Sequence, residues 1–279
     1  FLVLSYNASH STLMTRVVVK QNQKDLVLTG AQSGVLYVSA LPVEKNVFEG
    51  VRRKSKTLSQ AFQLVVGSKS SVEVVNDSST QLHLDDGSIQ YVFTDPPFGD
   101  YIPYAEINQL NETWLGSLTD RAGEIVMSVA EAKDVTTYGA LMAEVFAEVA
   151  RVLADDGMAT VVFHSAQAAV WRALIDAYSR AGLAVRTTSV LDKRQASFKQ
   201  VVSTTSVRGD PLILLDRSSH RPDLHSLTEV VEDVLASASE GPPDELTRER
   251  LYSRFVTRCL LAGVPVEIGA AEFYDRTQL

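Results

Sequence analysis

Residues 91–98 read Tyr-Val-Phe-Thr-Asp-Pro-Pro-Phe, a short apolar run that leads directly into two consecutive prolines. The run 91–94 predicts a β-strand, and the prolines end it because each lacks a backbone N–H and fixes φ. Outward from this strand the chain alternates predicted helices and strands. The predicted helices are 106–118, 138–153 and 166–181, and the further strands are 72–75, 159–164, 183–190 and 212–215. This alternation favours an α/β fold with a mostly parallel sheet and helices on both faces.

The two flanks of this central part differ from it. Residues 1–66 predict a strand-rich segment and a helix at 47–66, whose basic residues are either a phosphate contact or an ordinary solvated face. Residues 218–279 predict a helical appendage, with helices at 227–238 and 246–262, the second ending at Gly263. The basic residues in question are Arg52, Arg53, Lys54 and Lys56 on the first helix and Arg248, Arg250, Arg254 and Arg258 on the last. We therefore expect three parts, 1–66, 67–217 and 218–279.

Composition limits the classes of function. A chain of 279 residues with 45% hydrophobic residues can bury a substantial core. A net charge of −8 argues against broad non-specific coating of nucleic acid, although a local basic groove stays compatible with it. The single cysteine, Cys259, excludes an internal disulfide and a cysteine zinc cluster, and the histidines show no metal-ligand spacing. No apolar run reaches the ~18–20 residues of a membrane span, so we expect a cytoplasmic protein without a metal site.

Residues 95–98 carry the chemistry that the sequence offers. Ligands of open α/β sheets bind at the carboxyl ends of strands, where these residues fall. The carboxylate of Asp95, the carbonyl of Pro96 and the ring of Phe98 suit a flat base that carries an exocyclic amino group. Accepting both N–H bonds favours a tetrahedral nitrogen that can attack a sulfonium methyl group, so catalysis would come from positioning and fixed dipoles. The alternative is that the prolines only end a strand, and His164 likewise either lines this site or caps its own strand.

These residues resemble the Asp-Pro-Pro-aromatic motif of amino-methyltransferases that act on DNA. The stretches 85–98 and 104–115 and the segments 191–193, 197–200 and 210–213 are similar to bacterial adenine-specific DNA methylases of the large, defence-associated type, and the resemblance covers roughly residues 70–216. The resemblance implies a Rossmann-like methyltransferase sheet, S-adenosyl-L-methionine as cofactor, and DNA as substrate. It also implies a role in restriction-modification or phage defence, with other subunits of such a system as partners.

The resemblance also implies roles for individual residues. The implied site residues are Asp95, Pro96, Pro97 and Phe98 for catalysis and base binding, Asn76 and Asp77 for the cofactor, and Phe198, Lys199 and Gln200 for the substrate. Asp77 follows the predicted strand 72–75, where this fold places the group that contacts the cofactor adenine; an ordinary turn residue is the alternative. For residues 198–200 the alternative is a polar surface loop with one buried phenylalanine.

One expected element of such enzymes, a Gly-rich loop after the first strand, has no convincing match. The nearest candidate is 28–34, but strand-like residues 35–39 follow it where a helix should begin. The alternative is a loop upstream of Phe1, because the chain opens in strand-like residues without an initiator Met. The sequence thus predicts methylation of adenine N6 in DNA. Cytosine N4 in DNA, guanine N2 in RNA, and a non-catalytic DNA-recognition subunit without the cofactor loop are the alternatives.

Overall fold

The computed structural model describes residues 15–19, 27–31, 46–99, 104–191, 209–217, 226–239 and 247–277. The chain forms two compact units. Unit 1 comprises Phe1–Val75 and Ile102–Glu124, and unit 2 comprises Asn76–Tyr101 and Ile125–Leu279. The boundaries at 66/67 and 217/218 stay predictions.

Unit 1 combines a small hairpin with helices. Its elements are β1 (Thr15–Val19), β2 (Val27–Ala31), α2 (Val47–Val65), α3 (Tyr104–Leu115) and the 3-10 helix η1 (Arg121–Gly123). The strands pair antiparallel, with Arg16 opposite Gly30. Helix α2 begins where the side chain of Asn46 accepts a hydrogen bond from the backbone N–H of Glu49, as an N-cap does. The predicted helices at 47–66 and 106–118 are α2 and α3.

Unit 2 holds the α/β series. Its elements are β3 (Ile89–Thr94), α4 (Val135–Val152), β4 (Leu153–Val162), α5 (Ala168–Arg180), β5 (Ala184–Leu191), β6 (Asp210–Asp216), α7 (Leu227–Ser239), α8 (Arg248–Ala262) and α9 (Ala270–Thr277). Each predicted helix or strand from residue 91 onward has a counterpart among these elements and α3, and the α/β class is confirmed. Helix α8 ends at Gly263, whose φ of +67° is the left-handed conformation of a C-cap glycine. Among the described helices, none has the length and hydropathy of a membrane span.

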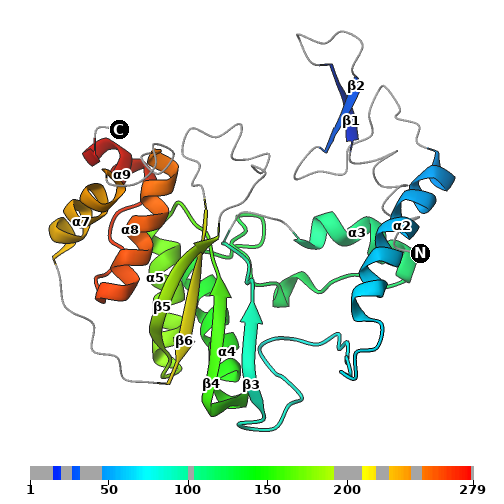
Figure 1. The fold of residues 1–279 in the computed structure, drawn as a ribbon, viewed down its shortest axis with the longest axis horizontal. Helices are drawn as coiled ribbons and strands as arrows, with labels where there is room; N and C mark the ends of the chain where they lie inside the picture. Colours follow the sequence, from blue (N-terminus) through cyan, green and yellow to red (C-terminus); the bar gives the residue numbers. More distant parts are fainter. Residues whose placement is uncertain are drawn as a thin grey trace. The chain divides into compact units, whose positions relative to one another are not determined.

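The sheet of unit 2 has the strand order β3-β4-β6-β5 (Figure 1). Strands β3 and β4 are parallel, whereas β6 is antiparallel to both of its neighbours. Strands β3, β4 and β5 therefore run in one direction and β6 runs against them. Of the three described pairings in this sheet one is parallel and two are antiparallel, so the predicted mostly parallel pairing is not met. An antiparallel return needs no helical crossover, in keeping with a sequence that predicts no helix between 190 and 212.

One face of this sheet is packed, and the other is exposed at β3, although Thr160 of β4 is buried there. Helices α4 and α5 lie side by side behind the strands in Figure 1, and they approach closely where Gly139 meets Ala173. On the packed face, Ala159 and Leu215 are fully buried. On the other face, Tyr91 is 53% and Phe93 64% exposed, and no described helix of unit 2 covers them. The expectation of helices on both faces is thus met on one face within the described part of this unit.

The predicted strand 72–75 is wrong. Residues 68–78 have no regular secondary structure, and Val72 and Val74 are 86% and 92% exposed. β-Branched residues favour a strand because they pack well on a pleated, half-buried surface. Without a partner strand to form that surface, the same residues do not form a strand. Residues 1–5 and 35–39, also expected as strands, lie outside the described residues.

Candidate active site at the carboxyl edge of the sheet

The Pro-Pro turn, residues 95–98, leaves the sheet beside the end of β4. The register places Thr94 opposite Val161, so the residues that follow β3 and β4 emerge side by side. Strand β6 begins at the same edge, because it runs antiparallel to β4 and Leu212 pairs with Val162. Three strands therefore bring chemistry-bearing side chains to one edge, where ligands of open α/β sheets bind.

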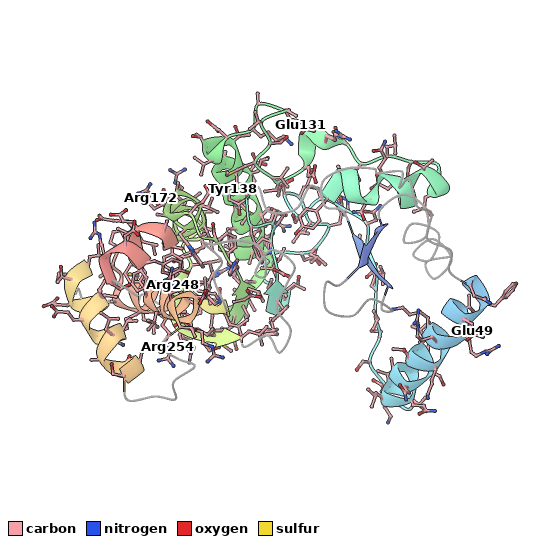
Figure 2. The ribbon with its side chains drawn as sticks, turned by 90° about the horizontal axis from the view of Figure 1, so that it is seen from above. Glu49, Glu131, Tyr138, Arg172, Arg248 and Arg254 are labelled. Carbon is pink, nitrogen blue, oxygen red and sulfur yellow. The ribbon has the colours of Figure 1, made fainter. Side chains whose placement is uncertain are left out.

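Hydrogen bonds fix the backbone of this turn. The hydroxyl of Tyr138, a fully buried residue of α4 (Figure 2), donates to the carbonyl oxygen of Pro97 at 2.6 Å. The backbone N–H of Met127 donates to the carbonyl oxygen of Gly99 at 3.2 Å. No described residue donates to the carbonyl oxygen of Pro96. The fold thus engages the carbonyl oxygens of Pro97 and Gly99, while Pro96 itself is buried.

Gly99 is required where it stands. Its φ is +86°, a conformation that L side chains rarely adopt. An added Cβ would also lie 3.4 Å from Cγ2 of Val170 and 3.5 Å from Sδ of Met127, which is ordinary contact. The backbone conformation, rather than crowding, therefore determines the glycine.

A column of aromatic rings anchors Phe98. Its ring meets that of Phe163 edge-on, with centroids 5.3 Å apart and planes at 80°. Phe163 in turn meets Trp171 at 4.9 Å and 75°, and Nε1 of Trp171 donates to the carbonyl oxygen of Ser165 at 2.9 Å. Phe163 and Trp171 are buried, whereas Phe98 is half-buried. The ring of Phe98 is therefore held by the core while part of its surface stays accessible.

His164 and Asp210 complete this edge. The imidazole centroid of His164 lies 6.1 Å from that of Phe98, and Nδ1 lies 3.5 Å from Oδ1 of Asp210. His164 lies near Phe98, and the choice between lining a site and capping its strand stays a prediction. Sequence reasoning gave no role to Tyr138, Phe163 or Asp210, since strand order and helix packing decide their positions. A weak signal existed for Asp210, which belongs to a segment of the resemblance.

Asp95 supplies the carboxylate of the site. It follows β3 directly, and its side chain is exposed. Asp95 and Pro96 directly precede Phe98 in the chain, so two acceptors and an aromatic ring belong to the same turn. This set can accept two N–H bonds from a planar amine while an aromatic surface supports the ring that carries it.

The predicted cofactor residues lie in irregular chain. Oδ1 of Asp77 accepts the backbone N–H of Ser78 at 2.8 Å, and Oδ2 lies 3.0 Å from Nε2 of His83. No described contact joins Asp77 or its exposed neighbour Asn76 to residues 95–98. Their role in cofactor binding stays a prediction. Phe198, Lys199 and Gln200 lie outside the described residues, so their role also stays a prediction.

The first glycine of the candidate Gly-rich loop at 28–34 lies in a strand and not in a loop. Gly30 lies inside β2, opposite Arg16 in the antiparallel pair of unit 1. A cofactor loop would instead join a strand of the main sheet to a helix N-terminus. Gly34 lies outside the described residues. Within the described part of the chain, His, Cys, Asp and Glu form no cluster that could hold a metal ion.

A charged clamp fixes the segment that enters β3. Arg151, near the end of α4, donates to Asp86 at 2.6 Å and to the carbonyl oxygens of Leu82 and Leu84 at 2.9 and 2.8 Å. It also donates to both carboxylate oxygens of Glu148 at 2.8 Å, and Glu148 accepts the backbone N–H of Leu82 at 2.7 Å. The hydrogen bonds from Arg151 and Leu82 lower the pKa of Glu148 from 4.5 to about 2. This clamp couples α4, which holds the Pro-Pro turn through Tyr138, to the start of β3.

Some of the basic residues considered for phosphate contacts have partners within the fold. Arg52 of α2 pairs with Glu49 at 2.8 Å. On α8, Arg258 pairs with Asp233 at 2.7 Å, and the guanidinium of Arg248 lies 5.7 Å from the ring centroid of Tyr274.

No protein-family model and no curated protein matches the chain. Solved structures are similar over part of its length. The PvuII DNA methyltransferase (cytosine-N4-specific) is 14% identical over 54% of this chain and 49% of its own, with a TM-score of 0.33. A candidate DNA modification methylase from Thermus thermophilus, complexed with S-adenosyl-L-methionine, is 13% identical over 62% and 70%, with a TM-score of 0.30.

An enzyme with a different substrate is similar to the same extent. Geranyl diphosphate C-methyltransferase from Streptomyces coelicolor A3(2) is 10% identical over 65% of this chain and 63% of its own, with a TM-score of 0.30. The chain spans 58%, 49% and 59% of the length of three of the matching structures.

Proposed function

We propose that this chain carries the target-base site of an S-adenosyl-L-methionine-dependent methyltransferase that methylates N6 of adenine in DNA. The observation that supports the proposal is the Pro-Pro turn at the carboxyl end of β3. Its Pro97 carbonyl is engaged by Tyr138, no described donor reaches the Pro96 carbonyl, and Asp95 is exposed next to Phe98. The two acceptors of the turn match the two N–H donors of a planar aryl amine, and the ring of Phe98 matches its flat surface.

The side chains of this turn then act by holding the amine. The two N–H bonds of the adenine amino group donate to the Asp95 carboxylate and the Pro96 carbonyl, which draws the nitrogen lone pair out of conjugation. Phe98 stacks on the base, a contact of about 1–3 kcal/mol in comparable complexes. Bound S-adenosyl-L-methionine supplies an electrophilic methyl group on sulfonium. After methyl transfer, the Asp95 carboxylate or water would accept the proton that the methylated nitrogen loses.

The rigidity of the turn matters for this mechanism. Misplacing a reacting group by about 1 Å can cost about 100-fold in rate. Several contacts limit movement of the turn. They are the hydrogen bonds from Tyr138 and Met127, the left-handed backbone of Gly99, and the edge-on contact of Phe163 with Phe98. Asn76 and Asp77 are the residues that we propose for contact with the adenosine part of the cofactor.

The test is methyl transfer from labelled S-adenosyl-L-methionine to double-stranded DNA, followed by mass spectrometry of the nucleosides. We expect N6-methyladenine from the wild-type chain and none from Asp95→Ala. Asp156→Ala is the matched control, because Asp156 is an exposed aspartate at the start of β4, at the opposite edge of the sheet. Equal activity of Asp95→Ala and Asp156→Ala would refute the proposed role of the turn.

The same acceptors can also hold the N4 amino group of cytosine or the N2 amino group of guanine. The reaction is then the same and only the base differs. The nucleoside analysis separates these substrates directly, since N4-methylcytosine or N2-methylguanosine would replace N6-methyladenine. Besides DNA, the proposed partners of this chain are other subunits of a restriction or defence system.

A second candidate function is DNA recognition without catalysis. It is favoured by the position of Gly30 inside the β1–β2 hairpin, which removes the nearest candidate for the cofactor loop. Isothermal titration of this chain with S-adenosyl-L-methionine discriminates the two. Micromolar binding supports the enzyme, whereas DNA binding without cofactor binding supports the recognition subunit.

A further inference from the structure

A pocket lies in unit 2 between α5, the start of β5 and the end of α8 (Figure 1). Its volume is about 400 Å³, within the range of small-molecule sites, which is about 300–1,000 Å³. Ala184, which lines the pocket, pairs with Asp216 at the end of β6, whereas the first residues of β6 lie at the edge of the Pro-Pro turn. The pocket therefore lies at the opposite edge of the sheet from the candidate active site.

The buried wall of this pocket is apolar. It includes the side chains of Leu183, Leu260 and Val264. Cys259 also lines the pocket, and burial raises the pKa of its thiol to about 12, so this side chain is neutral and acts as a small apolar group. Such a wall suits a hydrocarbon or aromatic group of a ligand, because burying apolar surface there favours binding.

One polar group of this wall has no partner among the described residues. Tyr178 of α5 lines the pocket and is 4% exposed, and no described residue hydrogen-bonds its hydroxyl. A buried hydroxyl costs free energy unless it finds a partner. Burial and the charge of Asp176 raise the pKa of Tyr178, so the hydroxyl stays protonated and can donate to an acceptor on a ligand.

Two opposite charges belong to the exposed part of the lining. Arg172 (Figure 2) and Asp176 lie four residues apart on α5, and hence on one face of this helix. Neither forms an ion pair with the other or with another described residue. The third charged residue of the lining, Arg186, pairs with Asp216 at 3.1 Å. Within the described part of the chain, the pocket thus offers one unpaired cation and one unpaired anion beside an apolar wall.

We propose that this pocket binds an apolar α-amino acid, such as phenylalanine. The carboxylate of the ligand accepts hydrogen bonds from Arg172 and from the Tyr178 hydroxyl. Its ammonium group donates to the Asp176 carboxylate, and its side chain contacts the buried wall. An apolar acid or an apolar amine would match only one of the two charges. None of these contacts involves the Pro-Pro turn, so the site does not depend on the proposed methyl transfer.

Isothermal titration of this chain tests the proposal with four probes. They are L-phenylalanine, 3-phenylpropanoate without the ammonium group, 2-phenylethylamine without the carboxylate, and L-serine without the apolar side chain. We expect phenylalanine to bind, and each of the two phenyl analogues to bind about 10- to 100-fold more weakly, the factor for one hydrogen bond to a charged group. Serine should also bind more weakly than phenylalanine, because it buries no apolar group in the wall.

Single substitutions assign each contact. Arg172→Gln should weaken phenylalanine binding about 10- to 100-fold but not the binding of 2-phenylethylamine, which has no carboxylate. Asp176→Asn should weaken phenylalanine binding by a similar factor but not the binding of 3-phenylpropanoate. Tyr178→Phe should weaken phenylalanine binding about 2- to 10-fold, the factor for a neutral hydrogen bond. Arg180→Gln is the matched control and should change nothing, because Arg180 is an exposed arginine of α5 outside the lining.

Three results would overturn the proposal. The first is no binding of phenylalanine at millimolar concentration. The second is equal affinity of the wild-type chain for phenylalanine and either phenyl analogue, because the two charges are then not recognised. The third is a loss of the same factor for every probe in Arg172→Gln or Asp176→Asn, since this reports damage to the fold. Where a variant does not fold, the four probes on the wild-type chain still decide.

Discussion

Replacing Tyr138 by phenylalanine removes one hydroxyl and keeps the ring that fills the core. The hydroxyl donates to the Pro97 carbonyl at 2.6 Å, and Tyr138 is fully buried. A net hydrogen bond contributes about 0.5–1.5 kcal/mol, and a buried acceptor left unpaired costs about 1–3 kcal/mol. Because Pro97 is half-buried and water reaches part of it, we expect a loss between the upper part of the first range and the lower part of the second, about 1–2 kcal/mol.

Thermal unfolding followed by circular dichroism measures this loss. Unit 2 has the size at which 1 kcal/mol shifts Tm by about 2–4 °C, so Tm should fall by about 2–8 °C. Tyr178→Phe is the matched control, since Tyr178 is also buried in unit 2 and no described residue hydrogen-bonds its hydroxyl. In the methylation assay, kcat of Tyr138→Phe should fall at least about tenfold while the KM for the cofactor stays unchanged, because the turn loses its anchor.

Two results would refute this reasoning. If Tyr138→Phe and Tyr178→Phe unfold at the same temperature, the hydroxyl does not stabilise the turn. If Tm falls but kcat does not, the turn keeps its geometry without the bond, and the Pro97 carbonyl has no part in placing the acceptors of the site.

Three further predictions concern other positions. Gly99→Ala should cost about 1–2 kcal/mol through its left-handed φ alone, seen as a lower Tm; an unchanged Tm would mean that the turn adopts another backbone conformation. Ser253→Ala should cost about 1 kcal/mol in denaturant unfolding, because the buried hydroxyl donates to the Gly209 carbonyl at 3.0 Å. The pKa of Glu148, lowered to about 2, predicts stability that is fully present above the unfolded value of 4.5 and lost as the pH falls toward 2. Glu148→Gln should flatten the dependence of Tm on pH in that window, and an identical pH profile would contradict the clamp.

Local patterns predicted the parts of this fold that local physics controls. The helix that became α4 has an apolar stripe that the core buries, including Met142, Phe146 and Val149. The strand that became β3 is closed by prolines that cannot continue it. The position of Asp95–Phe98 at a strand end followed from the same signal, so the centre of the candidate site could be predicted.

The rest depended on pairings that sequence does not specify. The predicted strand 72–75 has the right residues but no described partner, and its valines are exposed. The clamp of Arg151 joins residues 65 to 69 positions apart, and Asp210 reaches His164 only because β6 lies beside β4. Such contacts follow from strand order, which a single sequence does not reveal.

The strand order also has a consequence for how the chain is made. Synthesis runs from the N-terminus, and domains begin to fold as they emerge. Strands β4 and β5 are complete by residue 191, but their shared neighbour, β6, begins only at Asp210. Until then the two strands have unpaired edges facing the place of a strand not yet made, and such edges are templates for pairing with other chains. A chain truncated before residue 210 would therefore lack an inner strand of the sheet, between β4 and β5, and not a strand at its edge.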